Sequence, residues 1–143
     1  RMAPEGNPKA YKLPEAKLQG EYDFSFSGLK TAVLNLTRKL EKELGTIPKE
    51  DVAASFQECI TSTLFKKTLK AADAYGIKQI VLGGGVAANS EIRKKFFSLE
   101  EKGYKIFAPA MKYCTDNASM IASSAYFLAN TMESMEIEVF SRC

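Results

Sequence analysis

The chain has 143 residues, of which 45% are hydrophobic and 26% are charged, and this composition indicates one soluble globular domain. Its longest apolar stretch, near residues 80–88, is interrupted by three glycines and is far shorter than the ~20 residues of a membrane span. No signal peptide is visible either, so we expect a cytoplasmic protein that does not enter a membrane. The net charge of +3 permits contact with nucleic acid without arguing for it, whereas the absence of histidine excludes Ser-His and Cys-His catalytic pairs and any histidine-containing metal site built from these residues alone.

The first half of the chain predicts a connector, a strand and two helices. Residues 1–20 contain three prolines and two glycines, which is typical of an extended connector. Residues 22–27 alternate apolar and polar side chains, the period of a half-buried strand. Apolar residues then recur at helical spacing over 29–44 and from about 48 to 76, which predicts an antiparallel helical hairpin. Residues 21–76 are therefore one expected unit, a strand followed by a helical hairpin insertion.

Four residues mark the expected ends of these two helices. Ser27 is suited to cap the N-terminus of the first helix, and Gly45 is suited to end it. Pro48 fits the first turn of the second helix, which we expect to end near Gly76.

The second half predicts a β-α-β-α unit over residues 77–133, which we interpret as a nucleotide-binding subdomain. Two short apolar strands are expected at 78–82 and 104–108, a helix between them at about 89–103, and a final helix at about 117–132. This order implies parallel strands with a right-handed crossover, so the predicted fold class is α/β.

Three consecutive glycines follow the first of these strands. Glycine lets backbone amides approach a ligand closely and adopt positive φ, and the start of the next helix adds free N–H donors and the positive end of a dipole. Gly84, Gly85 and Asn89 are therefore candidates for binding a nucleotide, although the spacing matches neither a Walker A loop nor Gly-x-Gly-x-x-Gly. The alternative, equally open, is a glycine cluster that only makes a tight strand-to-helix turn.

An acidic residue, Asp116, opens the last predicted helix. Ligands in open α/β sheets bind at the carboxyl ends of strands, so Asp116 and the glycine turn should face one crevice. Its carboxylate is a candidate metal ligand. The competing explanation is that Thr115 or Asp116 serves only as the N-cap of the helix, a favoured role of these residue types.

Three weaker patterns have ordinary structural explanations. The block at 24–30 fits a core strand followed by a helix cap. The basic clusters at 38–39, 66–67 and 93–95 suit RNA phosphates, but they have acidic neighbours, as on a solvated helix face. Cys114 has no histidine to act as its base, so a buried unreactive thiol is expected.

Three sequence blocks, taken together and in order, resemble one known family. They are Asp-Phe-Ser-Phe-Ser-Gly-Leu-Lys-Thr-Ala-Val at 23–33, Gly-Gly-Gly-Val-Ala-Ala-Asn-Ser at 83–90 with Arg93, and Cys-Thr-Asp-Asn-Ala-Ser-Met-Ile-Ala at 114–122. They resemble signatures of the universal tRNA threonylcarbamoyladenosine family, formerly described as O-sialoglycoprotein endopeptidases or glycoproteases. Gly-Asn-Pro at 6–8 also lies where that family has a similar turn.

This resemblance implies an actin-like ATPase (ribonuclease-H-like) fold whose two lobes face each other across a nucleotide cleft. It implies transfer of a threonylcarbamoyl group from threonylcarbamoyl-AMP to N6 of adenosine 37 in tRNA. By the same resemblance, Gly84 and Gly85 line the adenylate pocket, Asn89 contacts the adenylate, and Asp116 ligates an iron or zinc ion. The implied partners are threonylcarbamoyl-AMP or another adenine nucleotide, tRNA, and accessory protein subunits; the catalytic residues stay unassigned.

The sequence also departs from this family. The family's two other protein metal ligands are histidines in a His-x-x-x-His motif of the first lobe, and this chain has no histidine. We therefore expect the C-terminal lobe of such an enzyme, with its helical insertion but with the first lobe missing, inactive alone and prone to self-association through any apolar face left exposed. The sequence after Tyr126 does not follow the family pattern. Residues 134–143 are expected to be a tail, with 136–140 as an edge strand or a frayed end.

Three rival functions stay open. A non-catalytic actin-like module would use the hairpin at 28–76 to bind a partner protein. A sugar- or acetate-kinase-like lobe would share the glycine turn and bind a nucleotide for phosphotransfer. A glycoprotease would need a protease nucleophile or a complete zinc site, and the sequence offers neither. Analogy at the level of the fold does not decide among them.

Overall fold

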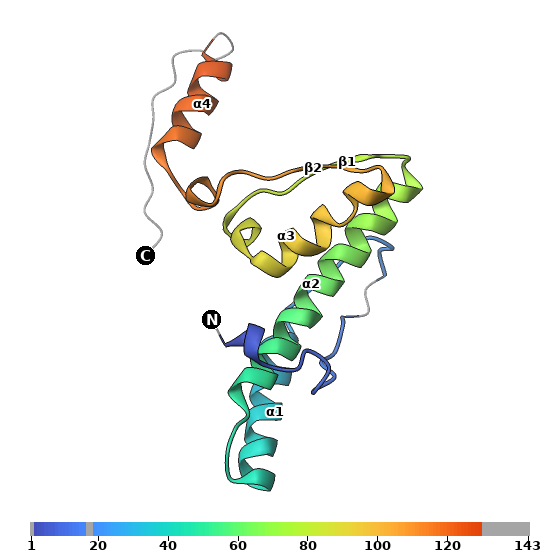
Figure 1. Ribbon diagram of the computed structural model, residues 1–143, viewed down its shortest axis with the longest axis vertical. Helices are drawn as coiled ribbons and strands as arrows, with labels where there is room; N and C mark the ends of the chain where they lie inside the picture. The colour runs from blue at the N-terminus through green and yellow to red at the C-terminus, as the bar shows by residue number, and fades with distance from the viewer. Residues whose placement is uncertain (1, 17–18, 130–143) are drawn as a thin grey trace.

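The computed structural model describes residues 2–16 and 19–129, which combine helices with a small parallel sheet, as the predicted α/β class requires (Figure 1). The long helix α2 runs through the molecule, with α1 beside one end and α3 and the two strands beside the other. The helices and strands in chain order are α1 (Leu29–Leu44), α2 (Lys49–Ala74), β1 (Gln79–Val81), α3 (Ser90–Phe97), β2 (Lys105–Phe107) and α4 (Ala118–Leu128). Short 3-10 turns are η1 (Ala3–Glu5), η2 (Gly85–Ala88), η3 (Glu100–Lys102) and η4 (Met111–Tyr113).

Helices α1 and α2 form the predicted hairpin. Gly45 ends α1 in the left-handed conformation, at φ 68°, and its N–H donates to the Glu41 carbonyl at 3.0 Å. Gly76 follows α2 at φ 65°, another conformation that side chains disfavour. Pro48 lies at the N-cap of α2, one residue before the expected first turn.

Residues 22–27 form no strand, which corrects the sequence prediction. The N–H of Ser27 donates to Ser25 Oγ at 3.3 Å, so a local turn takes up a backbone group that a strand would offer to a neighbour. Ser27 is not the helix cap either, because Gly28 holds that position without a side-chain hydrogen bond.

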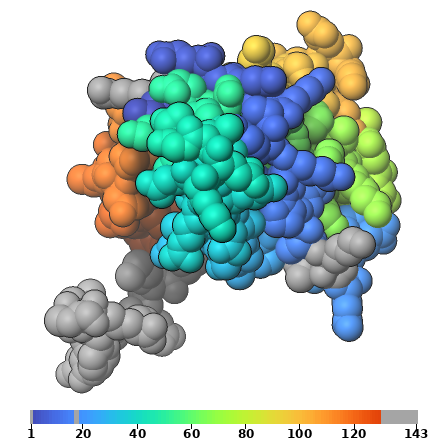
Figure 2. Space-filling model, turned by 90° about the horizontal axis from the view of Figure 1, so that it is seen from below, coloured from blue at the N-terminus to red at the C-terminus, as the bar shows by residue number. Residues whose placement is uncertain are grey.

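The N-terminal segment at 2–16, hereafter the strap, lies along α2. Figure 2 shows it in blue against the hairpin. The N–H of Asn7 donates to Asp51 Oδ1 at 2.7 Å, and the N–H of Tyr11 donates to Ser55 Oγ at 3.1 Å. These donors lie four residues apart and meet acceptors one helical turn apart, so the strap follows α2 in the same direction.

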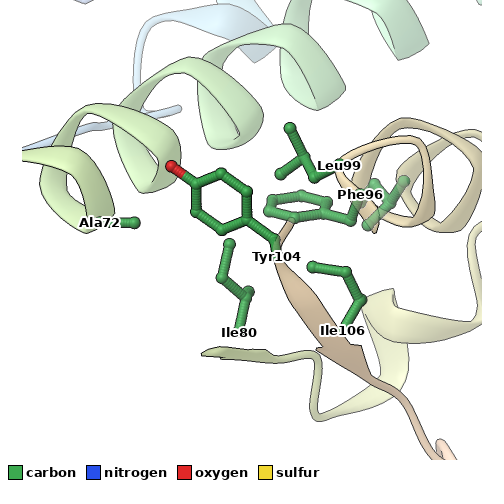
Figure 3. Packing of buried hydrophobic residues seen from close by; sticks show 7 residues of the cluster. Ala72, Ile80, Phe96, Leu99, Tyr104 and Ile106 are labelled. Atoms are coloured by element: carbon green, nitrogen blue, oxygen red, sulfur yellow. The ribbon is translucent and has the colours of Figure 1, made fainter. Parts of the chain in front are cut away.

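The two strands pair in parallel, with Ile80 of β1 opposite Ile106 of β2. One face of this sheet packs on α2 and α3 and forms the core (Figure 3). Figure 3 shows the Tyr104 ring reaching toward α2, and its hydroxyl donates to the Asp73 carboxylate. The buried cluster consists of Ala72, Ile80, Ile92, Phe96, Leu99, Tyr104 and Ile106. Both strands are confirmed, each a residue shorter at either end than expected.

The helix between the strands is shorter than its predicted range of 89–103. Helix α3 ends at Phe97, and the chain continues as a tighter turn in which the Leu99 N–H donates to the Phe96 carbonyl at 3.0 Å. This turn places Leu99 in the core with no exposed surface. Gly103, at φ 81°, then leads into β2.

Helix α4 projects away from the other elements (Figure 1). None of its residues is buried, and Tyr126 and Phe127 are 77% and 75% exposed. The predicted helix at 117–132 is confirmed as far as Leu128; its last residues, and the expected tail at 134–143, lie outside the described residues.

Candidate functional site

The turn after β1 presents bare backbone on its surface. Gly84 has φ 77° and ψ 176°, a conformation that glycine adopts far more readily than other residues. Gly83 and Gly85 have no positive φ, and a Cβ built on either of them meets no described atom within 4 Å. A tight turn therefore explains glycine at one of the three positions. Close approach of a ligand to the backbone would explain the other two.

Asn89 joins this turn to α3 and to α2. Its Oδ1 accepts hydrogen bonds from the N–H groups of Glu91 at 2.9 Å and Ile92 at 3.1 Å, which caps α3. Its Nδ2 donates to Gln57 Oε1 of α2 at 3.3 Å. The amide is thus held at both ends, and within residues 2–16 and 19–129 its second Nδ2 hydrogen has no acceptor, so it can meet a ligand.

Asp116 is exposed and is not the cap of α4. Asn117 caps that helix, because its Oδ1 accepts from the Met120 N–H at 3.0 Å. The structure therefore rejects the explanation that Thr115 or Asp116 is the N-cap. The Asp116 carboxylate makes no hydrogen bond or ion pair within the described residues, so it is free to ligate a cation.

A complete metal site is not built from the part of the chain that the structure describes. No group of three or more His, Cys, Asp or Glu side chains in residues 2–16 and 19–129 is placed to hold an ion. A metal on Asp116 would need its remaining ligands from elsewhere.

The structure brings the glycine turn and the loop that leads to Asp116 side by side. They leave the sheet at the same edge, where the last inter-strand hydrogen bond joins the Leu82 N–H to the Phe107 carbonyl at 2.7 Å. Beyond that bond, Arg93 of α3 hydrogen-bonds to the carbonyls of Ala87 and Pro109, one in each loop.

An apolar cavity of about 1150 Å³ lies between the glycine turn and the helical hairpin. Asn89, Gln57 and Lys30 are among its few polar residues. Its apolar walls include Phe24, Phe26, Leu29, Val33, Phe56, Ile60, Leu64, Val81, Val86 and Phe96. The aromatic residues of the block at 24–30 thus face a cavity instead of forming a core strand. Apolar walls with few convergent polar groups are typical of small-molecule sites.

A charged network fixes α3 on α2 close to this cavity. Lys95 Nζ donates to both carboxylate oxygens of Glu58 and to Ser62 Oγ, each at 2.8 Å. Partial burial by itself raises the pKa of Glu58, but the hydrogen bonds from Lys95 and Ser62 and the Lys95 charge outweigh it and lower that pKa below its usual range. The positive charge of Lys95 is therefore balanced by the Glu58 carboxylate beside it.

The comparison with known proteins decides the family. Residues 1–123 match the family of tRNA N6-adenosine threonylcarbamoyltransferases. The chain belongs to this family. Proteins of that name from Symbiobacterium thermophilum and Gloeothece citriformis are each 46% identical to it, over 90% and 99% of this chain, and one from Rippkaea orientalis is 48% identical over 87%.

The chain spans only 38%, 44% and 38% of the lengths of these three threonylcarbamoyltransferases. All three blocks that carried the family resemblance lie within the matched residues 1–123. Within the described residues, no helix has both the length and the apolar character needed to cross a membrane.

The sequence alone does not predict the structural roles of two residues in this region. In the sequence, Gln57 is one polar residue of a long helix, and Arg93 belongs to a basic cluster and accompanies the block at 83–90 that resembles the family, without a structural role assigned to it. The contacts that distinguish them join residues 32 and 16 positions apart in the sequence, which helical periodicity does not reveal.

Proposed function

We propose that this chain is the nucleotide-facing C-terminal lobe of a tRNA N6-adenosine threonylcarbamoyltransferase with an actin-like, ribonuclease-H-like fold. The family match across residues 1–123 carries this proposal. The bare glycine turn beside the Asp116 loop supports it, because it is the kind of surface that a phosphate or ribose approaches. The family match gives no support to the kinase-like lobe, the partner-binding module or the glycoprotease.

The proposed donor substrate is threonylcarbamoyl-AMP, and its nucleotide would lie between the glycine turn and the apolar cavity. The backbone N–H groups at Gly84 and Gly85 face anionic or hydroxyl oxygens of the nucleotide. The free Nδ2 hydrogen of Asn89 adds one side-chain donor beside them. The apolar walls suit an adenine ring, because aromatic and aliphatic side chains pack on its faces.

The proposed reaction needs orientation more than activation. The donor is a mixed anhydride, so its carbonyl carbon is already electrophilic. The N6 amine of tRNA adenosine 37 attacks this carbon, the bond to the phosphate oxygen breaks, AMP leaves and the amine loses a proton. Holding the adenylate in a fixed place turns this encounter into an oriented one, which is a large part of catalysis. No residue of this chain is assigned as the general base.

The carboxylate chemistry of Asp116 fits a divalent iron or zinc ion as one ligand among several. Two histidines outside this chain would complete the set. Bound there, the ion would supply Lewis-acid chemistry toward the carbonyl or the phosphate. The residue of this chain that we expect to hold it is Asp116 alone.

The remaining parts of the proposal concern partners. We propose tRNA as the acceptor substrate and accessory protein subunits as partners, with the chain inactive on its own. The exposed apolar side chains of α4 are consistent with self-association of the isolated chain.

A pair of glycine substitutions tests the nucleotide site. Gly85→Ala and Gly28→Ala each add a methyl group at a position without positive φ where no atom lies within 4 Å, so neither should strain the fold. Only Gly85 lies in the turn. Isothermal titration of each variant with threonylcarbamoyl-AMP should show binding by the unaltered chain and by Gly28→Ala, and its loss in Gly85→Ala. Equal binding by both variants would contradict the proposed site.

A further inference from the structure

Arg93 hydrogen-bonds to both loops at the carboxyl edge of the sheet. Its Nε donates to the Ala87 carbonyl in the glycine turn at 2.6 Å. Its Nη2 donates to the Pro109 carbonyl after β2 at 2.5 Å and to Cys114 Sγ at 3.2 Å. Within the described residues, no other side chain donates to both segments.

The strands alone do not fix these loops to each other. Past the hydrogen bond from the Leu82 N–H to the Phe107 carbonyl, no hydrogen bond of the described residues joins 83–89 directly to 108–117. The guanidinium is planar and charged and donates from several nitrogens at fixed angles, so it can bond to two backbone carbonyls at once. A lysine ammonium lacks this fork.

We propose that Arg93 is a positioning residue that clamps the glycine turn to the Asp116 loop. The clamp fixes the separation between the proposed nucleotide surface at Gly84 and Gly85 and the proposed cation ligand Asp116. That this separation spaces a nucleotide from a cation rests on the proposed function. The clamp itself rests only on the hydrogen bonds of Arg93. Arg93 acts through the backbone of both loops and needs no contact with substrate.

Cys114 provides a reporter for the clamp. Cys114 is 3% exposed and its Sγ accepts a hydrogen bond from the guanidinium, so movement of the loop away from Arg93 exposes the thiol. Cys59 on α2 is partly exposed and far along the chain from the clamp, and burial raises the pKa of its thiol, so it serves as a slow internal reference. Both cysteines are present in every variant.

The test compares Arg93→Met, Arg93→Lys and, as a control, Lys94→Met, which removes a neighbouring exposed charge from the same helix. The full chain is treated with iodoacetamide, and peptides containing Cys114 and Cys59 are quantified by mass spectrometry. Amide hydrogen exchange is measured in peptides that cover 83–89 and 108–117. Circular dichroism gives the thermal midpoint of each variant.

We expect Arg93→Met to raise the alkylation rate of Cys114 by about tenfold or more relative to Cys59, as a locally opened loop would. Exchange should rise in both peptides together. Arg93→Lys should keep the thermal midpoint but not restore protection of both peptides, because one ammonium replaces the fork. If Arg93 only stabilised the fold, Arg93→Met would instead lower the thermal midpoint, and Arg93→Lys would restore both the midpoint and the protection of the two peptides. Lys94→Met should change neither the alkylation rate of Cys114 nor the amide exchange of the two peptides.

Unchanged Cys114 alkylation in both Arg93 variants, or exchange that rises in only one loop, would overturn the clamp. If Arg93→Met does not fold, the lysine variant decides the result. Adding threonylcarbamoyl-AMP separates the two proposals: it should slow Cys114 alkylation in the unaltered chain and not in Arg93→Lys. If the nucleotide has no effect while the Arg93 variants behave as expected, the clamp stands and the proposed nucleotide site fails.

Discussion

Helix α4 is richer in apolar side chains than helix α3, with eight of its eleven residues apolar against three of eight, yet α3 is the better packed of the two. Phe96 at the end of α3 is 3% exposed and meets the Phe65 ring of α2 edge-on, with centroids 5.4 Å apart. Phe127 near the end of α4 is 75% exposed and touches only its neighbour Tyr126 among aromatic rings of the described residues.

The contrast shows that apolar sequence is not sufficient for burial. Helix α3 has α2 and the sheet to pack on, so its apolar side is covered and its polar side carries the charges. Helix α4 has eleven residues and no described surface beneath it, and an isolated helix of that length is marginal in water.

The largest loss of unfolding free energy is expected from a substitution in the core next to α3. Leu99→Ala should lower the free energy of unfolding by ~3–4 kcal/mol, because Leu99 is fully buried among packed side chains and the vacated space cannot close completely. Urea unfolding followed by circular dichroism measures this. A loss below ~1 kcal/mol would mean that the region around α3 is no better packed than α4.

The next largest loss of unfolding free energy is expected from a substitution in the strap. A Cβ on Gly6 would lie 2.1 Å from the Glu50 carbonyl oxygen, so Gly6→Ala forces the strap off the start of α2. We expect a loss of ~1–3 kcal/mol in the same unfolding measurement, as for other overpacked contacts. Gly28→Ala is the matched control, because its added methyl group meets nothing within 4 Å. Equal losses in both variants would show that the strap is not held at Gly6.

The contact between Glu58 and Lys95 gives a smaller effect that depends on pH. The pKa of Glu58 is lowered from its ordinary value of 4.5, so its ion pair stabilises the fold above that pH and the contribution is lost as the pH falls through the lowered value. Glu58 keeps 41% of its side chain exposed, so solvent screening limits the gain to at most ~1 kcal/mol. The free energies of unfolding of the unaltered chain and of Glu58→Gln should differ near pH 6, and the difference should shrink as the pH falls below 4.5. A difference that grows on acidification would have the wrong sign.

The smallest effect is expected on α4. Phe127→Ala should change the free energy of unfolding by less than ~0.5 kcal/mol, because the side chain covers nothing in the described fold. A loss comparable with that of Leu99→Ala would show that α4 is packed in solution and would remove the contrast between the helices.

Much of the fold was predictable because it depends on local rules. Gly45 and Gly76 end helices at positive φ, which favours glycine, and Asn89 caps α3 as its residue type favours. The strands at Ile80 and Ile106 followed from short apolar runs beside turn residues.

The errors arose where several local solutions compete. The alternation at 22–27 is equally suited to a strand and to aromatic side chains that line a cavity, and the Ser25 turn selects the second. Asn117 and Asp116 are both good caps, and only the backbone course shows that Asn117 is used. The bonds of Gln57 and Arg93 depend on how helices pack, which no single stretch of sequence contains.

The most direct test asks whether Asp116 and the glycine turn belong to one site. Manganese(II) is the probe, because paramagnetic broadening of nearby amide resonances in an NMR spectrum of the full chain needs only weak binding to a carboxylate and not a complete metal site. We predict broadening at 83–89 and 114–117 in the unaltered chain and in Asp23→Asn, a control carboxylate elsewhere, and its loss in Asp116→Asn. Broadening that spares 83–89, or that persists in Asp116→Asn, would contradict a shared nucleotide and metal site in this chain.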